Sequence, residues 1–368
     1  MTAPPIAGTK SCYRRYSNNQ IGAIVRCHRL FTLFLLLILL AACNTYWPSH
    51  PTPSPSTAPI FVLNRKLGHG LNLGDALDAP SEGEWGLALE EEYFKLIADA
   101  GFDHIRVPIR WTAHAADTPP YTIDETFFER IDWVLENAKA NGLAVVINHH
   151  HYDQVMSDPV GQHDKFVSMW QQIATRYRDQ PDSVIFELLN EASGELTMNK
   201  WNDLAAELIA VIRKNNPTRA IIIGSIDYNK LHTLPLLKLP DDPNLIVTFH
   251  YYEPFSFTTQ GADWLEGADS WLGTTWTGTV MQRRSIERDF DQVATWARAN
   301  NRPIYLGEFG AIRKADDESR IRWTRAVTES ASKRDFSLAY WEFASEFGLY
   351  DRERNEWNQG LLDAALGK

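Results

Sequence analysis

Short apolar runs alternate with amphipathic segments from residue 61 to the end of the chain. Eight runs rich in β-branched and aromatic residues have the length of buried strands. They are GHGLNL (68–73), HIRVPI (104–109), AVVIN (144–148), VIFELL (184–189), AIIIG (220–224), LIVTFH (245–250), PIYLGEF (303–309) and SLAYWEF (337–343). Helical periodicity marks the segments 87–100, 125–141, 164–178, 199–215, 286–300 and 317–333. This alternation predicts a parallel sheet covered by helices.

Two α/β architectures fit this order of elements. A body of about 300 residues suits a single (β/α)8 TIM barrel, and an open doubly wound sheet is the alternative. The first strand is not followed by the G-x-G-x-x-G pattern, which weakens the dinucleotide-binding version of the open sheet. We therefore predict the barrel.

The N-terminal region has the features of a targeting segment. The basic stretch VRCHRL precedes a short apolar run, and LAAC then ends at Cys43. The pattern resembles a bacterial lipoprotein signal peptide over 1–42, with Cys43 as the lipidated residue; an ordinary signal anchor is the alternative. Residues 43–60 are rich in Pro, Ser and Thr and predict an extended tether, followed by the folded domain at 61–368. We expect a secreted, lipid-anchored protein at a bacterial outer membrane or cell surface, whose membrane contact is the anchor alone.

Composition narrows the classes of ligand. A formal net charge of −11 argues against nucleic acid, because phosphate binding needs a basic surface. The 13 tryptophans suit a neutral ligand with flat faces. Since the cysteines are Cys12, Cys27 and Cys43, the body lacks a disulfide framework, a cysteine-ligated metal and a catalytic thiol.

Polar residues collect where the predicted strands end, and in a barrel these ends form one face. They are Asn72, Arg106, Asn148, His149, His150, His151, Asn190, Glu191, His250, Tyr252, Glu308, Trp341 and Glu342. Glu191 and Glu308 would oppose each other across this face, as the two carboxylates of glycosidic bond cleavage do. Gly307 and Gly310 flank Glu308 and would leave room for a ligand.

The remaining charges receive structural interpretations. Glu187 lies within a strand and is expected to pair with Arg106 inside the barrel, whereas Glu195 is a solvated loop charge. Arg106 near Glu308 is expected to lower the pKa of that carboxyl group, and burial or a neighbouring carboxylate should raise the pKa of Glu191.

The triple histidine invites a metal interpretation. Neighbouring residues of an extended segment point to opposite sides, so only His149 and His151 could converge. No H-E-x-x-H motif, cysteine pair or acidic cluster is nearby to complete a site. We expect no metal.

IFELLNEAS and, much later, PIYLGEFGA resemble glycoside hydrolase family 5, the cellulase and β-mannanase family. The resemblance covers the whole body, through HGLNLGDALDAPSEGEWG, HIRVPIRW, VVINHHHYD, VTFHYYEPF and LAYWEF in order. It is strongest to bacterial endo-β-1,4-glucanases, some of which accept mannan. It implies that Glu191 is the acid/base and Glu308 the nucleophile of a retaining mechanism.

The resemblance also implies substrate-binding roles. Asn190 would hold a sugar 2-hydroxyl and Arg106 would lie beneath Glu308. His150, His151, His250 and Tyr252 would line the site. Trp341 would be a stacking platform, with a core tryptophan as the alternative, and Asn72 would either touch the ligand or tie down the first loop.

Several positions depart from the family pattern. Ala192 stands where proline is usual, Asp75 and Asp78 where close relatives have Asn and Glu, and Thr259 where they have His. These departures leave the preference between cellulose and mannan open. Trp264, Trp271 and Trp276 form either an extra sugar-binding rim or a packed loop.

Taken together, the sequence predicts a retaining endo-β-1,4-glucanase acting on a β-linked polysaccharide, without a cofactor and as a monomer. A β-mannanase, or an enzyme with both activities, is the enzymatic alternative. A non-catalytic carbohydrate-binding lipoprotein is the alternative from another class.

Overall fold

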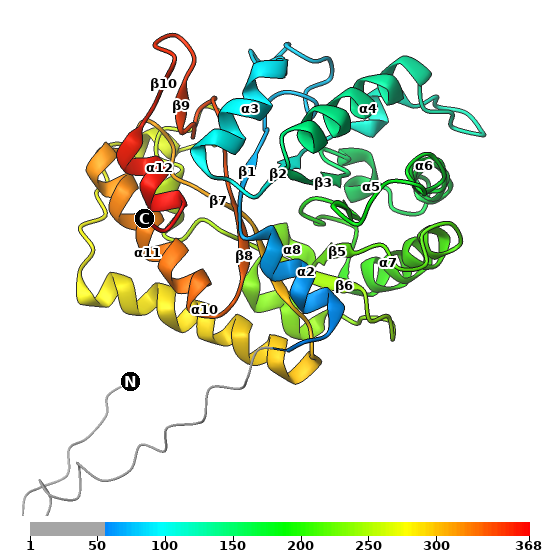
Figure 1. The fold of residues 1–368 in the computed structure, drawn as a ribbon. Coiled ribbons are helices and arrows are strands. Elements are labelled where there is room, and N and C mark those ends of the chain that lie inside the picture. The colour runs from blue at the N-terminus through cyan, green and yellow to red at the C-terminus, as the bar shows by residue number, and fades with distance from the viewer. Residues whose placement is uncertain (1–55) are drawn as a thin grey trace, which may run out of the picture. The chain divides into compact units, whose positions relative to one another are not determined.

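A computed structural model describes residues 56–368; the predicted signal peptide, Cys43 and most of the tether lie outside the described residues. Eight parallel strands close into a barrel in sequential order, and helices surround it (Figure 1). The strands are β1 (His69–Asn72), β2 (His104–Val107), β3 (Ala144–Asn148), β4 (Val184–Glu187), β5 (Ile221–Gly224), β6 (Leu245–Tyr251), β7 (Ile304–Phe309) and β8 (Ser337–Tyr340). The (β/α)8 prediction is confirmed, because β1 pairs with β8 and the open sheet is thereby excluded.

The six predicted helices are all present around the barrel. They are α3 (Glu91–Ala100), α4 (Glu125–Ala140), α6 (His163–Arg176), α7 (Met198–Arg213), α10 (Val280–Asn300) and α11 (Asp317–Ser332). Helix α10 begins at Val280 and not at residue 286, where the apolar periodicity predicted its start, because Thr279 and Gln282 form a capping box ahead of the amphipathic part. No helix in residues 56–368 has the length and apolar character needed to cross a membrane.

Short elements occupy the connections between strands and helices. They are η1 (Trp111–His114), α5 (Asp153–Ser157), α8 (Ile226–Asn229), η2 (Leu231–Leu236), α9 (Phe255–Thr258), η3 (Ala268–Trp271), β9 (Tyr350–Asp351), β10 (Glu356–Trp357) and α12 (Gln359–Ala365). Strands β9 and β10 form a small antiparallel hairpin after the barrel closes.

Helix α2 (Pro59–Leu67; blue in Figure 1) packs on the barrel from its amino-terminal side and was not predicted. Its Ile60 and Leu67 join the apolar residues that fill the lower interior of the barrel. Asn64 donates to the carbonyl of Ile304 and accepts from the hydroxyl of Ser337, which fastens the helix to β7 and β8.

The barrel interior changes from apolar to polar along the strands. Val146, Ile185 and Ile246 belong to the lower apolar layer. Two residues further along the same strands are Asn148, Glu187 and Thr248, which are also completely buried. The polar end is therefore built into the strands themselves and supports the mouth of the barrel.

Candidate active site

Arg106 on β2 is the centre of the polar layer and is completely buried. Its guanidinium forms a two-pronged ion pair with Glu187, at 2.7 and 2.8 Å. It also donates to Glu308 Oε1 at 2.7 Å and to the side-chain oxygens of Asn72 and Asn190, each at 2.8 Å. All five N–H groups therefore have partners, and the predicted pairing of Glu187 with Arg106 is confirmed.

Glu308 reaches the mouth of the barrel through an irregularity in β7. The register with β6 pairs Phe249 with Leu306 and His250 with Glu308, which leaves Gly307 as an extra residue. Such a β-bulge re-aims the side chain that follows it. A Cβ at Gly307 would lie 2.7 Å from Thr248 Oγ1, so only glycine fits the bulge without displacing its neighbour.

Glu191 lies four residues beyond the end of β4, in a left-handed backbone conformation with φ of 50°. A residue with a side chain rarely adopts this conformation, and such residues concentrate at functional sites. The side chain is 27% exposed, in contrast to 6% for Glu308, so Glu191 faces the open side of the mouth. Glu195 is exposed in the following loop, as predicted.

His250 connects the two carboxylates. Its Nδ1 is 2.7 Å from Glu191 Oε1 and 3.6 Å from Glu308 Oε2. Tyr252 donates its hydroxyl to Glu308 Oε2 at 3.0 Å. One carboxylate oxygen of Glu191 and one of Glu308 lie within 4.8 Å of each other.

Electrostatics assigns different protonation states to the two carboxyl groups. Burial raises the pKa of Glu191 to about 7, and the negative charge of Glu187 adds to the rise while Arg106 opposes it. Two carboxylates this close resist ionising together. Because Glu308 receives hydrogen bonds from both Arg106 and Tyr252, the proton belongs on Glu191 and the charge on Glu308.

The pKa of Glu308 results from two opposing effects. Burial raises this pKa, and His250 and Arg106 oppose the rise without reversing it. Arg106 therefore lowers the pKa of Glu308 as predicted, but the polar layer that supplies the guanidinium also removes water, and this burial outweighs it.

The predicted space beside Glu308 is also filled by the protein. A Cβ at Gly310 would lie 2.1 Å from the carbonyl oxygen of Trp341. Together with the contact at Gly307, this shows that both glycines admit neighbouring strands and not a ligand, which corrects the expectation from sequence.

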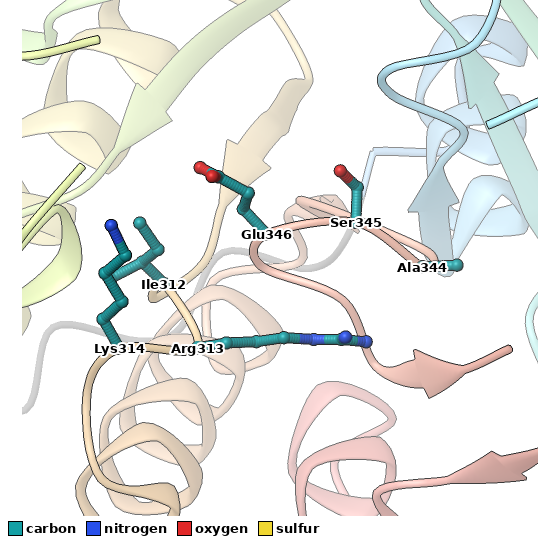
Figure 2. Close-up of a pocket in the computed structure, with 6 residues that line it drawn as sticks. All are labelled: Ile312, Arg313, Lys314, Ala344, Ser345 and Glu346. Carbon is teal, nitrogen blue, oxygen red and sulfur yellow. The ribbon is translucent and has the colours of Figure 1, made fainter. Parts of the chain in front are cut away.

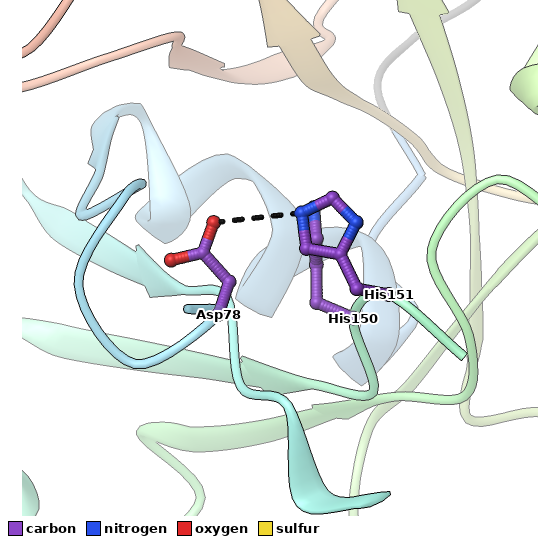
Figure 3. A group of neighbouring side chains, drawn as sticks. All are labelled: Asp78, His150 and His151. Carbon is purple, nitrogen blue, oxygen red and sulfur yellow. Dashed lines mark ion pairs between the residues drawn. The ribbon is translucent and has the colours of Figure 1, made fainter. Parts of the chain in front are cut away.

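The three histidines do not alternate as predicted. His149 is buried and stacks on Tyr152, away from the mouth. His150 and His151 instead lie next to each other beside Asp78, with His151 Nε2 3.8 Å from Asp78 Oδ2 (Figure 3). The prediction that at most His149 and His151 could converge is wrong, because His151 has a φ of 48°, which ends the extended backbone.

Trp341 is partly exposed and stacks parallel to His150, with ring centroids 5.8 Å apart. Gly74 makes room for its ring, because a Cβ there would lie 2.8 Å from it. The core alternative for Trp341 is therefore excluded, and the ring forms part of the wall of the mouth.

Two predicted substrate-binding residues have no exposed surface. Asn72 and Arg106 are both completely buried. The amide of Asn72 donates to the carbonyls of Gly307, Ala339 and Tyr340, which ties β1 to β7 and β8. Arg106 lies beneath Glu308 as expected, and Asn72 is held by β7, β8 and Arg106, so the polar groups of both residues are satisfied inside the protein and neither offers surface to a sugar.

The residues that depart from the family pattern lie at the rim. Asp78 is completely buried and accepts the backbone N–H groups of Asp75 and Ala76, so it shapes its own loop. The hydroxyl of Thr259 bonds to the carbonyl of Phe255 and is buried. The carboxylate of Asp75 accepts a hydrogen bond from the hydroxyl of Ser345.

The tryptophan-rich loop contains both a buried and an exposed indole. Trp276 is buried in the core and its backbone N–H donates to the Ser319 hydroxyl, whereas Trp264 is 62% exposed and its ring contacts that of Phe347. Near Phe347 is a cavity of about 340 Å³, lined by Ile312, Arg313, Lys314, Ala344, Ser345 and Glu346. Lys314 and Glu346 extend toward this space, while Arg313 runs away beneath the loop (Figure 2).

Within the described residues, two groups bring three potential metal ligands together. They are Asp78 with His150 and His151, and Glu191 with His250 and Glu308. In the second group, hydrogen bonds already join the ligand atoms to one another or to Arg106 and Tyr252. This donor set suits proton transfer between a carboxyl pair.

Sequence reasoning missed Asn229, whose amide lies 3.3 Å from His250 Nε2. It also missed Trp85, which contacts His151 edge-on. Neither residue follows a strand directly, so a search for polar residues at strand ends could not find them. The sequence signal for Asn229 was the segment IDYN, whose Asp and Asn are typical of turns.

Comparisons with known proteins agree with this geometry. Residues 73–346 match the family described as Cellulase (glycosyl hydrolase family 5). Endoglucanase H of Acetivibrio thermocellus is 37% identical over 325 residues, which cover 86% of this chain and 35% of that protein. The chain thus spans about a third of the length of that relative.

A solved structure extends the likeness to three dimensions. Cel5A of Thermotoga maritima, crystallised with mannotriose, superimposes with a TM-score of 0.82 at 48% identity, covering 83% of this chain and 99% of that one. The same protein has been crystallised with cellobiose. The sequence match, the closed barrel and the paired glutamates at its mouth lead to one conclusion: the chain belongs to glycosyl hydrolase family 5.

Proposed function

We propose that the protein is a retaining endo-β-1,4-glucanase that hydrolyses β-glucan chains. The observation that carries this proposal is the pair formed by Glu191 and Glu308, whose nearest oxygens lie within 4.8 Å. Retaining enzymes hold their carboxyl groups about 5–5.5 Å apart, whereas inverting enzymes need about 6.5–9.5 Å to admit a water. The short separation supports retention.

The chemistry proceeds in two displacements. Glu308 attacks the anomeric carbon while Glu191 gives its proton to the glycosidic oxygen, and the shortened chain leaves with its new hydroxyl. Glu191, now ionised, takes a proton from water, and the resulting hydroxide displaces Glu308 from the sugar. Arg106 and Tyr252 hold Glu308 by its two oxygens, which fixes the nucleophile before substrate arrives.

Sugar binding is assigned to the exposed aromatic wall. The indole of Trp341 offers an apolar face that matches the C–H face of a β-linked sugar. His150, which is buried, stacks on the Trp341 ring, and His151 is partly exposed beside it; Asn190, with its side-chain oxygen held by Arg106, lies next to Glu191. The relatives named as endoglucanases support glucan as the substrate.

A β-mannanase activity, alone or alongside, is the second candidate. It is favoured by the mannotriose complex of Cel5A, a relative that has also been crystallised with cellobiose. Product profiles on carboxymethyl-cellulose and on mannan distinguish the candidates, and release of products of intermediate length identifies internal cleavage.

The test of the mechanism is Glu308→Gln, with the exposed Glu195→Gln as matched control. We expect the first variant to lose hydrolysis and the second to retain it, and NMR of early products from the unmodified protein to show the β-anomer. Full hydrolysis by Glu308→Gln would reject the mechanism. Binding of β-glycan without hydrolysis by the unmodified protein would favour a non-catalytic carbohydrate-binding lipoprotein.

We also propose that Cys43 carries a lipid that anchors the enzyme to a bacterial outer membrane or cell surface, and that the enzyme acts as a monomer. The support is the signal pattern that ends in LAAC and the Pro- and Ser-rich segment after it. Cys43→Ser should move the protein from the membrane fraction to the soluble fraction, and sedimentation of the soluble form measures the oligomeric state.

A further inference from the structure

The turn that follows β5 has an unusual backbone. Asp227, Tyr228 and Asn229 all have positive φ, at 56°, 62° and 55°. Left-handed backbone is costly for residues with side chains, although Asn and Asp tolerate it better than others. The turn sends Tyr228 outward, where it is 54% exposed, and Asn229 inward, where it is 1% exposed. A Cβ at Gly224 would lie 2.0 Å from Asn229 Oδ1, so β5 also makes room for this amide.

The buried amide meets the histidine that touches the acid/base. Asn229 Nδ2 lies 3.3 Å from His250 Nε2, and on the other side of the ring Nδ1 lies 2.7 Å from Glu191 Oε1. Burial lowers the pKa of His250 to about 4, so the neutral ring carries one proton at working pH. An amide N–H only donates, so with the Asn229 amide nitrogen facing Nε2 this ring nitrogen would accept, which places the proton on Nδ1.

The surroundings of Nδ1 favour the same tautomer. Glu308 Oε2 lies 3.6 Å from Nδ1, in addition to the closer oxygen of Glu191. A lone pair on Nδ1 would face two carboxyl groups, whereas an N–H there is attracted to both. The same turn also contacts the acid/base loop, because Tyr228 N donates to the carbonyl of Ala192 at 3.4 Å.

We propose that Asn229 is a positioning residue for the acid/base: by keeping the His250 proton on Nδ1, it keeps the acidic proton of Glu191 on Oε2, available to the leaving oxygen. With Nδ1–H donating to Oε1, that oxygen is an acceptor, and the carboxylic proton must reside on Oε2. In the opposite tautomer, Nδ1 would accept the Glu191 proton through Oε1 and withhold it from the substrate. The role rests on the hydrolytic function proposed above.

The test replaces the amide donor of Asn229 by a carboxylate acceptor of nearly the same shape. Asn229→Asp keeps the size and tolerance for left-handed backbone but demands a proton on Nε2. That change either takes the proton from Nδ1, so that Nδ1 competes for the Glu191 proton, or adds a positive charge that lowers the pKa of Glu191; both reduce the fraction of Glu191 with a proton available for the leaving oxygen. We expect kcat/KM for cellotetraose to fall at least about tenfold, since positioned acids contribute 10²–10⁴-fold. For dinitrophenyl β-cellobioside, whose phenolate leaves without a proton, we expect a change within about twofold.

A matched variant controls for the substitution itself. Asn301 also has positive φ, at 49°, and is an exposed residue at the end of α10. Asn301→Asp should leave both rates unchanged. Equal losses on the two substrates in Asn229→Asp would indicate a merely structural role and overturn the proposal, as would unchanged rates on both.

The tautomer can be measured independently of activity. The nitrogen NMR spectrum of His250 should show protonated Nδ1 in the unmodified protein and protonated Nε2 in Asn229→Asp. Protonated Nε2 alone in the unmodified protein would overturn the proposal. Inactivity of the unmodified protein on both substrates would reject hydrolysis itself, while the NMR result would still decide the role of Asn229.

Discussion

Arg106→Met is the substitution that tests the polar layer most directly. The guanidinium is completely buried and forms ion pairs at 2.7 Å with both Glu187 and Glu308. The methionine side chain fills a similar volume but leaves two buried carboxylates without a cation. Since removing one partner of a buried pair costs about 3–5 kcal/mol, we expect a loss of at least about 3 kcal/mol in the free energy of unfolding.

Urea denaturation followed by tryptophan fluorescence at pH 7 measures this loss. Lys95→Met is the control, because Lys95 forms an even shorter pair with Asp99, at 2.5 Å, and the two side chains are 70% and 64% exposed. Exposed pairs contribute little, so the control should unfold at the same urea concentration as the unmodified protein. Burial, and not distance, is what distinguishes the two.

The loss in the free energy of unfolding should also depend on pH and on the residue that replaces Arg106. Buried carboxylates that have lost their cation can take up protons, so the loss caused by Arg106→Met should narrow between pH 7 and pH 5. The free energy of unfolding of Arg106→Lys should lie between those of Arg106→Met and the unmodified protein, because an ammonium group keeps the charge but lacks the planar guanidinium that bonds two partners at once. A loss below about 1 kcal/mol in Arg106→Met would refute the inference that this arginine holds the layer together.

Three further predictions concern catalysis. Burial raises the pKa of Glu191 to about 7, and only the protonated acid donates, so kcat/KM should fall as the pH rises through that value. Lys230→Met removes a positive charge that lowers this pKa, so the fall in kcat/KM should move to higher pH. A pH–rate profile of each protein measures both effects. Tyr252→Phe deletes a hydrogen bond to charged Glu308, which at about 1.5–3 kcal/mol predicts a decrease in kcat of about 10- to 100-fold. Trp341→Ala should raise KM for cello-oligosaccharides more than it changes kcat, because the stacking surface binds substrate away from the reacting atoms.

The barrel and its two glutamates were predictable from local patterns. Buried parallel strands leave apolar runs, and amphipathic helices leave periodic ones, so the eight strands and six main helices appear in the sequence. Glu191 and Glu308 stand out because strand ends of a barrel share one face. Helix α2 escaped prediction because it begins at Pro59, inside a segment whose composition indicates a tether.

The details of the site depended on backbone geometry that no local pattern reveals. His151 and Glu191 have positive φ without being glycine, and alternation along an extended chain therefore failed for the histidines. Gly307 and Gly310 admit protein neighbours that come from other strands. The direction of the Glu308 pKa shift depends on how much water the assembled barrel excludes, which Arg106 alone does not determine.

The sequence by itself determined the fold class, the positions of the two candidate carboxyl groups of Glu191 and Glu308, and the Glu187–Arg106 pairing, because each follows from periodicity along a strand or from residue type at its end. Only the tertiary structure decided which carboxyl group carries the proton and how His250 and Asn229 hold it. Those properties arise from distances between strands β4, β5, β6 and β7, which are far apart in sequence and meet only when the barrel closes.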